Sequence, residues 1–389
     1  MRKKYILLML SLCVSISSIN AIVSFADTDL TGVEDMQMQE AEGSLQPISL
    51  SLDGAYKQLE SSKTIELVKL KKQSDLSISK GYSEAVSNYN KQEKEDTFVM
   101  GYDSSNKYVA QARRNFANLM IDANHQARLN SIGLEVFKKY HTIKNTEKQV
   151  EIAKESLQLK NNMLETTKRK YEVGSSSKRE IEDAEKEVKD LEANVENLES
   201  NLKQLKENFN SYLGYDISQE LILTDALEEI PMQEIDLEEA IQLALKNRNE
   251  MREADYNVEI SQLNFNSYKA YPTSSSKYIK AKTQLLNAQI AKENRPTDIE
   301  LDVKGKYNSM KESYNSVQTA KKALSSAEES LSAVTRKLDL GMVTSTQVKQ
   351  AELAVKNAEL TLDNCLLNYN IAVENYTLSM GAGTFAVNI

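Results

Sequence analysis

Apolar residues recur at heptad spacing in two stretches of the chain, and each stretch ends at a glycine. The residues before Gly174 and those before Gly341 both include an apolar side chain at every seventh position. These are Val136, Ile143, Val150, Leu157, Leu164 and Tyr171 in the first stretch, and Val303, Met310, Val317, Leu324, Leu331 and Leu338 in the second. After each glycine, apolar residues continue in alternating steps of three and four, over 181–209 and 348–376. An apolar period of about 3.5 residues, held over several heptads, predicts long helices that supercoil around a partner.

The two stretches are copies of each other, 167 positions apart. "IGLEVFKKYHTIKNTEKQVEIAKESL" from Ile132 matches "IELDVKGKYNSMKESYNSVQTAKKAL" from Ile299, and the offset holds without a gap to Gly214, which recurs as Gly381. Farther upstream, "LDGAYKQL" resembles "LEEAIQLAL" at an offset of 185. The chain therefore reads as a tandem duplication, with a first copy over 47–216 and a second copy over 236–381.

Each copy contains a glycine turn between two helices. The stretches "YEVGSSSKRE" and "LDLGMVTSTQ" place Gly174 and Gly341 at the end of the first helix, because glycine adopts the left-handed backbone conformation at little cost. Ser177 with Glu180, and Thr344 with Gln347, have the spacing of capping boxes that begin the second helix. The prediction is an antiparallel helical hairpin in each copy, and Gly174→Val or Gly341→Val should strain the turn by about 1–2 kcal/mol.

Two further helix starts are predicted from capping residues. Thr297 with Glu300, next to a proline, and Asp236 with Glu239, at the start of the second copy, both have the capping-box spacing. Neither "AYPTSSSKYIKAKTQLLNAQIAKENRPTDIE" nor "EDTFVMGYDSSNKYV" alternates apolar and polar residues over the length of a strand. The predicted fold is therefore all-α, built of tandemly duplicated long antiparallel coiled-coil hairpins with little or no β structure.

The N-terminus has the features of a secretory signal. Three basic residues, at positions 2–4, precede an apolar segment, and small residues before Asp27 place cleavage after Ala26. Lipid attachment at Cys13 is the less favoured alternative, since a bulky Leu12 precedes it. The expected segments are a signal peptide at 1–26, an acidic leader at 27–46, the first copy, a connector at 217–235, the second copy and a tail at 382–389.

Charge and cysteine content narrow the class of protein. Loss of the three signal-peptide cations changes the formal net charge from −9 to −12, and an acidic surface argues against nucleic acid as a partner. Cys365 is the one cysteine of the mature chain, so we expect no intrachain disulfide. No stretch after the signal approaches the ~20 apolar residues of a membrane helix.

The sequence offers little for catalysis. His125 and His141 are the only histidines and are 16 residues apart, too far along one helix to share a metal ion. Cys365 occupies a heptad core position, which indicates a small packed side chain rather than a nucleophile. There is no glycine-rich phosphate loop, and the carboxylates of "REIEDAEKEVKDLEANVENLES" suit the solvent face of a coiled coil. We therefore expect no catalytic, cofactor or metal site.

The order of these motifs resembles the TolC family of outer-membrane efflux proteins. The similarity lies in "IDLEEAIQLALKNRNEM" with the "AYP" that follows, in "EVFKKY" and "DVKGKY", and in the two glycine hairpins, over about residues 47–381. The resemblance implies a homotrimer in which each protomer contributes two hairpin units to a hollow α-barrel. It also implies outer-membrane location, docking of the hairpin tips onto a pump or adaptor protein, and export of drugs, metals or polypeptides.

The chain departs from this family in one respect. Family members place two membrane strands in each copy, where "TSSSKYIKAKTQLLNAQIAKEN" and the stretch around Met100 stand here. Helix-forming Lys, Ala, Gln and Leu occupy the first of these, so we expect the family's strands to be absent. The rival hypothesis is an extracytoplasmic coiled-coil interaction or spacer protein that kept the helices after losing the duct.

The resemblance also points to residues at the hairpin tips. In the family, acidic residues just after the hairpin glycine help to close the tip or form a cation-attracting ring. The matching residues are Glu180 and Asp183 in the first copy, and the neutral Gln347 and Gln350 in the second. The alternative is that Glu180 and Gln347 only cap helices and that Asp183 is solvated. The tip candidates are Gly174, Ser177, Glu180, Asp183, Gly341, Thr344, Gln347 and Gln350.

Overall fold

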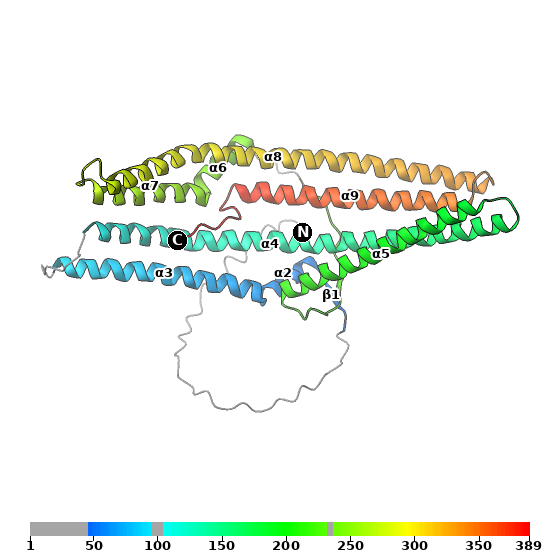
Figure 1. The fold of residues 1–389 in the computed structure, drawn as a ribbon, viewed down its shortest axis with the longest axis horizontal. Helices are drawn as coiled ribbons and strands as arrows, with labels where there is room; N and C mark the ends of the chain where they lie inside the picture. Colours follow the sequence, from blue (N-terminus) through cyan, green and yellow to red (C-terminus); the bar gives the residue numbers. More distant parts are fainter. Residues whose placement is uncertain (1–45, 95–103, 232–235) are drawn as a thin grey trace, which may run out of the picture.

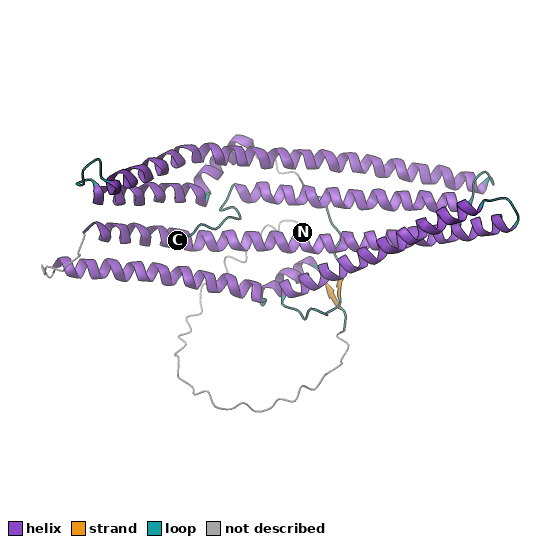
Figure 2. Ribbon diagram, in the orientation of Figure 1, coloured by secondary structure: helices purple, strands orange, loops and turns teal. Residues whose placement is uncertain are grey.

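The structure is a computed structural model that describes residues 46–94, 104–231 and 236–389. The predicted signal peptide and nearly all of the acidic leader, as well as the stretch around Met100, lie outside these residues. The chain folds into a long rod of helices that run side by side (Figures 1 and 2). The helices of the first copy are α2 (Leu52–Glu60), α3 (Lys63–Lys94), α4 (Ser104–Glu172) and α5 (Lys178–Leu213). Those of the second copy are α6 (Leu237–Asn247), α7 (Asn249–Tyr268), α8 (Ser276–Asp339) and α9 (Ser345–Ser379).

Helices α4 and α8 run the length of the rod and hold its two ends together. α4 has 69 residues and is therefore about 100 Å long. At one end the order across the rod is α8, α7, α4, α3, and at the other it is α8, α9, α4, α5 (Figure 1). Both glycine turns lie at the second of these ends, and α3 and α8 lie at opposite edges of the layer.

A two-stranded parallel sheet lies beside the first copy. β1 (Ile48–Leu50) pairs with β2 (Leu221–Leu223), with Ile48 opposite Leu221 and Leu50 opposite Leu223. These three-residue strands are the only ones in the described ranges, so the predicted all-α class with little β structure is confirmed. The sheet is fastened to α4 by Tyr140, whose hydroxyl donates to the Leu50 carbonyl (2.9 Å) and accepts from the Asp225 amide (2.9 Å).

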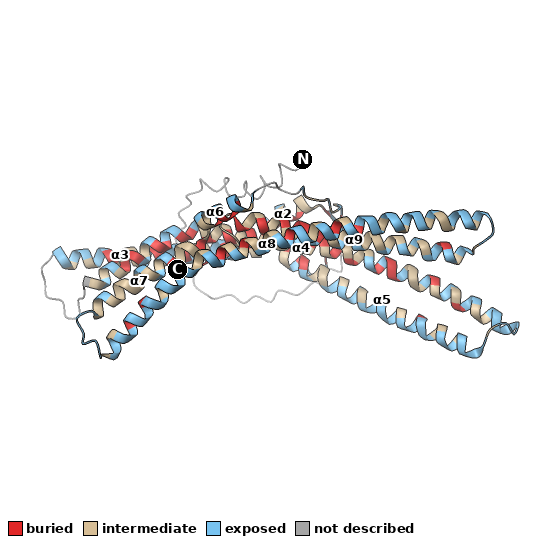
Figure 3. Ribbon diagram, turned by 90° about the horizontal axis from the view of Figure 1, so that it is seen from above, coloured by how far each residue is buried: buried red, intermediate tan, exposed pale blue. Residues whose placement is uncertain are grey.

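Each copy buries its own core, and the two cores use equivalent positions. The heptad residues Val136 and Val303 are fully buried, and Phe209 of the first core has Tyr376 as its counterpart 167 residues on. Burial is concentrated toward the middle of the rod, where several helices meet (Figure 3). Toward the turns the seam is less covered: Leu331 and Leu338 are half-buried and Tyr171 is exposed. Two helices alone cannot enclose a seam residue on all sides, which explains why the regular pattern is only partly buried there.

One of the two further predicted helix starts is wrong, and the other begins a helix without the predicted capping bond. α8 continues through Pro296, so Thr297 lies inside a helix and Glu300 pairs with Lys304 instead of forming a cap. Proline removes one backbone hydrogen bond, which a helix of 64 residues packed on α7 and α9 tolerates by bending. Asp236 does precede α6, but its side chain makes no capping hydrogen bond. The connector is anchored to the second copy, because Asn370 of α9 binds the backbone of Glu228 and Ile230.

His141 should make the protein less stable as the pH falls. Burial among Phe137 and Tyr140, with Lys144 nearby, lowers its pKa from 6.5 to about 4. Between these values the unfolded chain binds a proton that the folded chain does not, so acidification favours unfolding. We expect a loss of about 3 kcal/mol between pH 6.5 and pH 4 that is absent in His141→Phe. Urea unfolding of both proteins across this range tests it, and equal slopes would contradict it.

Candidate functional site

The turn of the first hairpin is short, and hydrogen bonds cap both the end of α4 and the start of α5. Gly174 has φ +74°, and the Ser175 amide donates to the Lys170 carbonyl (2.8 Å), which closes α4. Ser177 then begins α5: its hydroxyl accepts from the Glu180 amide (3.2 Å), and the Glu180 carboxylate accepts from the Ser177 amide (2.7 Å). The predicted capping box is confirmed.

The turn of the second hairpin has the same geometry with different side chains. Gly341 has φ +69°, and the Met342 amide donates to the Lys337 carbonyl (2.9 Å). Thr344 and Gln347 form the second capping box, with the Thr344 amide 2.9 Å from the Gln347 side-chain oxygen. The two turns therefore have the same backbone geometry and differ in the side chains around the glycine.

The acidic tip residues are engaged in local contacts. Glu180 also accepts a hydrogen bond from the Ser176 hydroxyl, and this bond with that of the Ser177 amide lowers the pKa of the carboxyl. Asp183 is exposed and lies 3.9 Å from Arg179, one turn earlier on the same helix. In the second hairpin, Gln350 points to the sulfur of Met163 on α4 (3.9 Å). Nothing in the described chain brings Asp183 and Gln350 together, so a constriction would need residues from other chains.

The tips expose apolar side chains that the sequence analysis missed. Val173 beside Gly174, and Leu340 and Met342 on either side of Gly341, are 78%, 69% and 71% exposed. The signal was present in the sequence, because "LGMV" places apolar residues in a turn that polar residues could form equally well. Single exposed apolar residues are common on protein surfaces, and these three lie at two equivalent turns. The second tip is the more apolar of the two.

A groove separates the two hairpins in the tip half of the rod. It has a volume of about 460 Å³, and Leu159 of α4, Leu331 of α8 and Leu353 of α9 contribute its apolar wall. Two ion pairs join α4 to α9: Lys356 with Glu155 in the wall of the groove, and Lys148 with Asp363 (2.8 Å) farther toward the middle of the rod. The hairpins are thus fixed together near the middle and diverge toward their tips (Figure 3).

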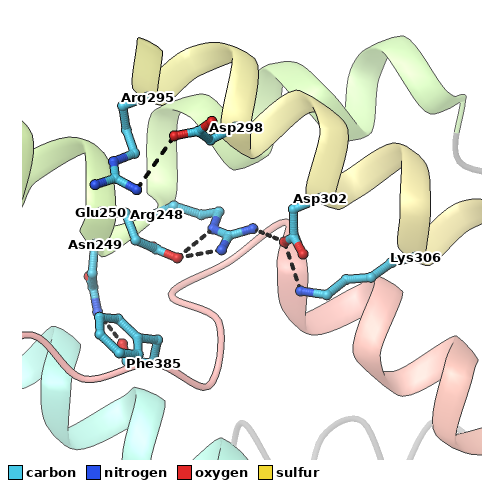
Figure 4. Close-up of polar contacts among 8 residues, drawn as sticks. All are labelled: Arg248, Asn249, Glu250, Arg295, Asp298, Asp302, Lys306 and Phe385. Atoms are coloured by element: carbon cyan, nitrogen blue, oxygen red, sulfur yellow. Dashed lines mark hydrogen bonds and ion pairs between the residues drawn. The ribbon is translucent and has the colours of Figure 1, made fainter. Parts of the chain in front are cut away.

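A polar junction fixes the second copy where α6 gives way to α7. Arg248 lies in extended backbone between the two helices, and its guanidinium binds Glu250 of α7 and Asp302 of α8 (Figure 4). Lys306 is a second partner of Asp302 (2.9 Å). Burial alone would raise the pKa of Asp302, but the hydrogen bonds from Lys306 and Arg248 lower it. These contacts join α7 and α8 at the junction through the guanidinium of Arg248.

Gly174 should contribute to stability only through its backbone conformation. A Cβ at Gly174 would meet no atom within 4 Å, yet its φ lies in the left-handed region. Gly174→Val should therefore lower the free energy of unfolding by about 1–2 kcal/mol. The control is Gly305→Ala inside α8, where a Cβ is equally unobstructed and the helix should gain about 0.5–1 kcal/mol. Urea unfolding tests both, and a neutral Gly174→Val would show that the turn can rearrange.

The described residues contain neither a candidate metal site nor a candidate membrane helix. No group of three or more His, Cys, Asp or Glu within these ranges is placed to hold an ion. No helix there combines the length and the apolar character that spanning a membrane requires. Cys365 is a free, half-buried thiol packed against the second core.

Comparison with known proteins supports the predicted resemblance. Residues 273–382 match the model of the outer membrane efflux protein family. No curated protein gives a significant match. Similar solved structures are those of TolC-family channels, so the resemblance to that family and the helical fold are confirmed.

Three solved structures illustrate the likeness. A membrane protein from Pseudomonas aeruginosa is 11% identical with a TM-score of 0.61, and the match covers 85% of this chain and 93% of that one. The outer membrane protein VceC from Vibrio cholerae is 13% identical with a TM-score of 0.53, and the match covers 86% of this chain and 97% of that one. The CmeC outer membrane channel of Campylobacter jejuni is 11% identical with a TM-score of 0.54, and the match covers 95% of each chain. At such low identity the likeness establishes the fold.

Proposed function

We propose that this chain, whose second copy matches the outer membrane efflux protein family, is a non-catalytic export component of the cell envelope. The observation that carries the proposal is the placement of both glycine turns at one end of the rod, with apolar side chains exposed around them. Two equivalent tips at one end suit docking onto a pump or adaptor protein. The hairpin residues Gly174, Ser177, Glu180 and Asp183, with Gly341, Thr344, Gln347 and Gln350, shape this surface.

Several copies are needed to enclose a duct, because one chain is an open layer. Its edges, α3 and α8, both expose leucines: Leu67, Leu70 and Leu76 on α3, and Leu301 on α8. A line of contacts crosses the layer from α8 to α3 at one height along the rod. It runs from α8 to α7 through Lys292–Asp255, from α7 to α4 through Tyr256–Phe116, and from α4 to α3 through Asn118–Ser79. All four leucines lie on the middle side of that level, so edges of neighbouring copies can meet there. By family resemblance we propose a trimer closed by this contact.

The alternative is a coiled-coil spacer protein of the cell envelope. One observation favours it: residues 276–297 are helical where the resemblance implies membrane strands. A spacer needs long stiff helices and terminal contact surfaces but no closed duct. The two proposals differ in whether loss of the protein impairs export.

Export itself is the test. Deleting the gene should raise retention of a fluorescent efflux substrate, and the wild-type gene should restore export. A Leu340→Glu/Met342→Glu double variant should fail to restore it, because buried carboxylates would oppose docking of the tip. Ser325→Glu/Ser332→Glu, at exposed positions of α8, the helix that leads into this turn, is the matched control and should restore export. Unchanged export in the deletion strain would favour the spacer.

A further inference from the structure

The end of the rod opposite the glycine turns has an unusual charge. From residue 260 to residue 292, across the α7–α8 turn, there is no Asp or Glu, although the chain has 57 acidic residues. The same stretch contains five lysines: Lys269, Lys277, Lys280, Lys282 and Lys292. An acid-free basic segment in a protein of negative net charge indicates an anionic partner at this end.

The first turns of α8 also expose an apolar stripe. Ile279, Leu286 and Ile290 are 51%, 47% and 56% exposed. Their spacing of seven and four residues places them on one helix face, while Ala281 and Leu285 on the other side are buried. Lys280 and Lys282 flank this stripe. α8 is therefore apolar on two faces here, and the described chain covers one of them.

The turn between α7 and α8 adds aromatic residues. Tyr271 is exposed, lies edge-on to Tyr268 (ring centroids 5.6 Å apart) and has the Lys277 ammonium 5.5 Å above its ring. Tyrosine and lysine both combine an apolar body with a polar end, which suits a boundary between water and lipid.

A second copy of this chain does not fit the stripe. The line of contacts from Lys292 to Ser79 shows that these two residues lie at the same height along the rod. The part of α8 before residue 292 therefore lies at the same height as the part of α3 after residue 79. Beyond that level the described part of α3 has no exposed large apolar residue, and its exposed charges are of both signs: Lys80, Lys91 and Lys94 with Glu84 and Glu93. An edge-to-edge neighbour would thus present a polar helix surface here and leave Ile279, Leu286 and Ile290 uncovered.

We propose that residues 268–292 form a membrane-surface site for anionic phospholipid. α8 lies along the bilayer, Ile279, Leu286 and Ile290 enter the boundary between headgroups and acyl chains, and the flanking lysines bind lipid phosphates. A soluble polyanion would satisfy the lysines but leaves the apolar stripe without a purpose. This inference goes beyond the proposed export role and stands or fails independently of it.

Vesicle flotation of the mature full-length protein tests the site. We expect binding to vesicles of phosphatidylcholine mixed with phosphatidylglycerol and little to phosphatidylcholine alone. Lys277→Glu/Lys280→Glu/Lys282→Glu should weaken binding by more than about tenfold. Ile279→Ser/Leu286→Ser/Ile290→Ser should also weaken it. Lys322→Glu/Arg336→Glu/Lys337→Glu, at exposed positions near the other end of α8, makes the same change in net charge and should bind normally.

A spectroscopic probe locates the contact. The chain has no tryptophan, so Ile279→Trp introduces a single reporter whose emission should shift to shorter wavelength on anionic vesicles, whereas Ser332→Trp should not respond. Three results would overturn the proposal: no flotation, equal binding by the α8 variants, or binding to soluble polyglutamate with no shift on vesicles.

Discussion

Replacing Tyr140 with alanine is expected to lower the free energy of unfolding by about 3–5 kcal/mol. The side chain is fully buried and packs against Phe209, and its hydroxyl joins β1 and Asp225 to α4. Tyr140→Phe keeps the ring but leaves the Asp225 amide without its partner, which should cost about 1–3 kcal/mol. Urea unfolding at neutral pH measures both variants.

Tyr376 is the matched control for this prediction. It occupies the position equivalent to Phe209, is fully buried, and its hydroxyl has no hydrogen-bond partner in the described chain. Tyr376→Phe should therefore leave stability unchanged or raise it slightly, since an unpaired buried hydroxyl is removed. A cost at Tyr376 with none at Tyr140 would mean that the hydroxyl of Tyr140 does not anchor the sheet.

Replacing leucines at both edges of the layer is expected to prevent assembly. In Leu70→Asp/Leu301→Asp the carboxylates would be buried wherever edges of neighbouring copies meet, and an unpaired buried charge is strongly unfavourable. Light scattering should show the mass of one chain, with helix content unchanged because both positions are exposed in the single chain. Leu70→Met/Leu301→Met, which keeps an apolar surface, should assemble normally. Assembly of the aspartate variant would place the contact elsewhere.

Local sequence signals predicted the hairpins well. Gly174 and Gly341 have the left-handed conformation, and Ser177 and Thr344 form capping boxes, because each depends on residues within a few positions. The buried positions of the heptad pattern were also predictable. Val136 and Val303 are fully buried because residues at heptad spacing fall on one face of a helix.

Features set by tertiary packing were not predictable in this way. Pro296 and Thr297 have the residue types of a helix start, but packing on neighbouring helices carries α8 through them. β1 and β2 are three residues each and about 170 positions apart, too short to show a period. At the tips the residues predicted from the sequence were the acidic and amide side chains, whereas the structure also places Leu340 and Met342 at the surface.

The most direct test of the central claim is an electron-microscopy image of the mature protein in solution, with its mass from light scattering. The proposed function predicts three chains in a closed ring of long helices around an open centre, with all glycine turns at one end. A rod with the mass of a single chain, or a bundle with a filled centre, would contradict it.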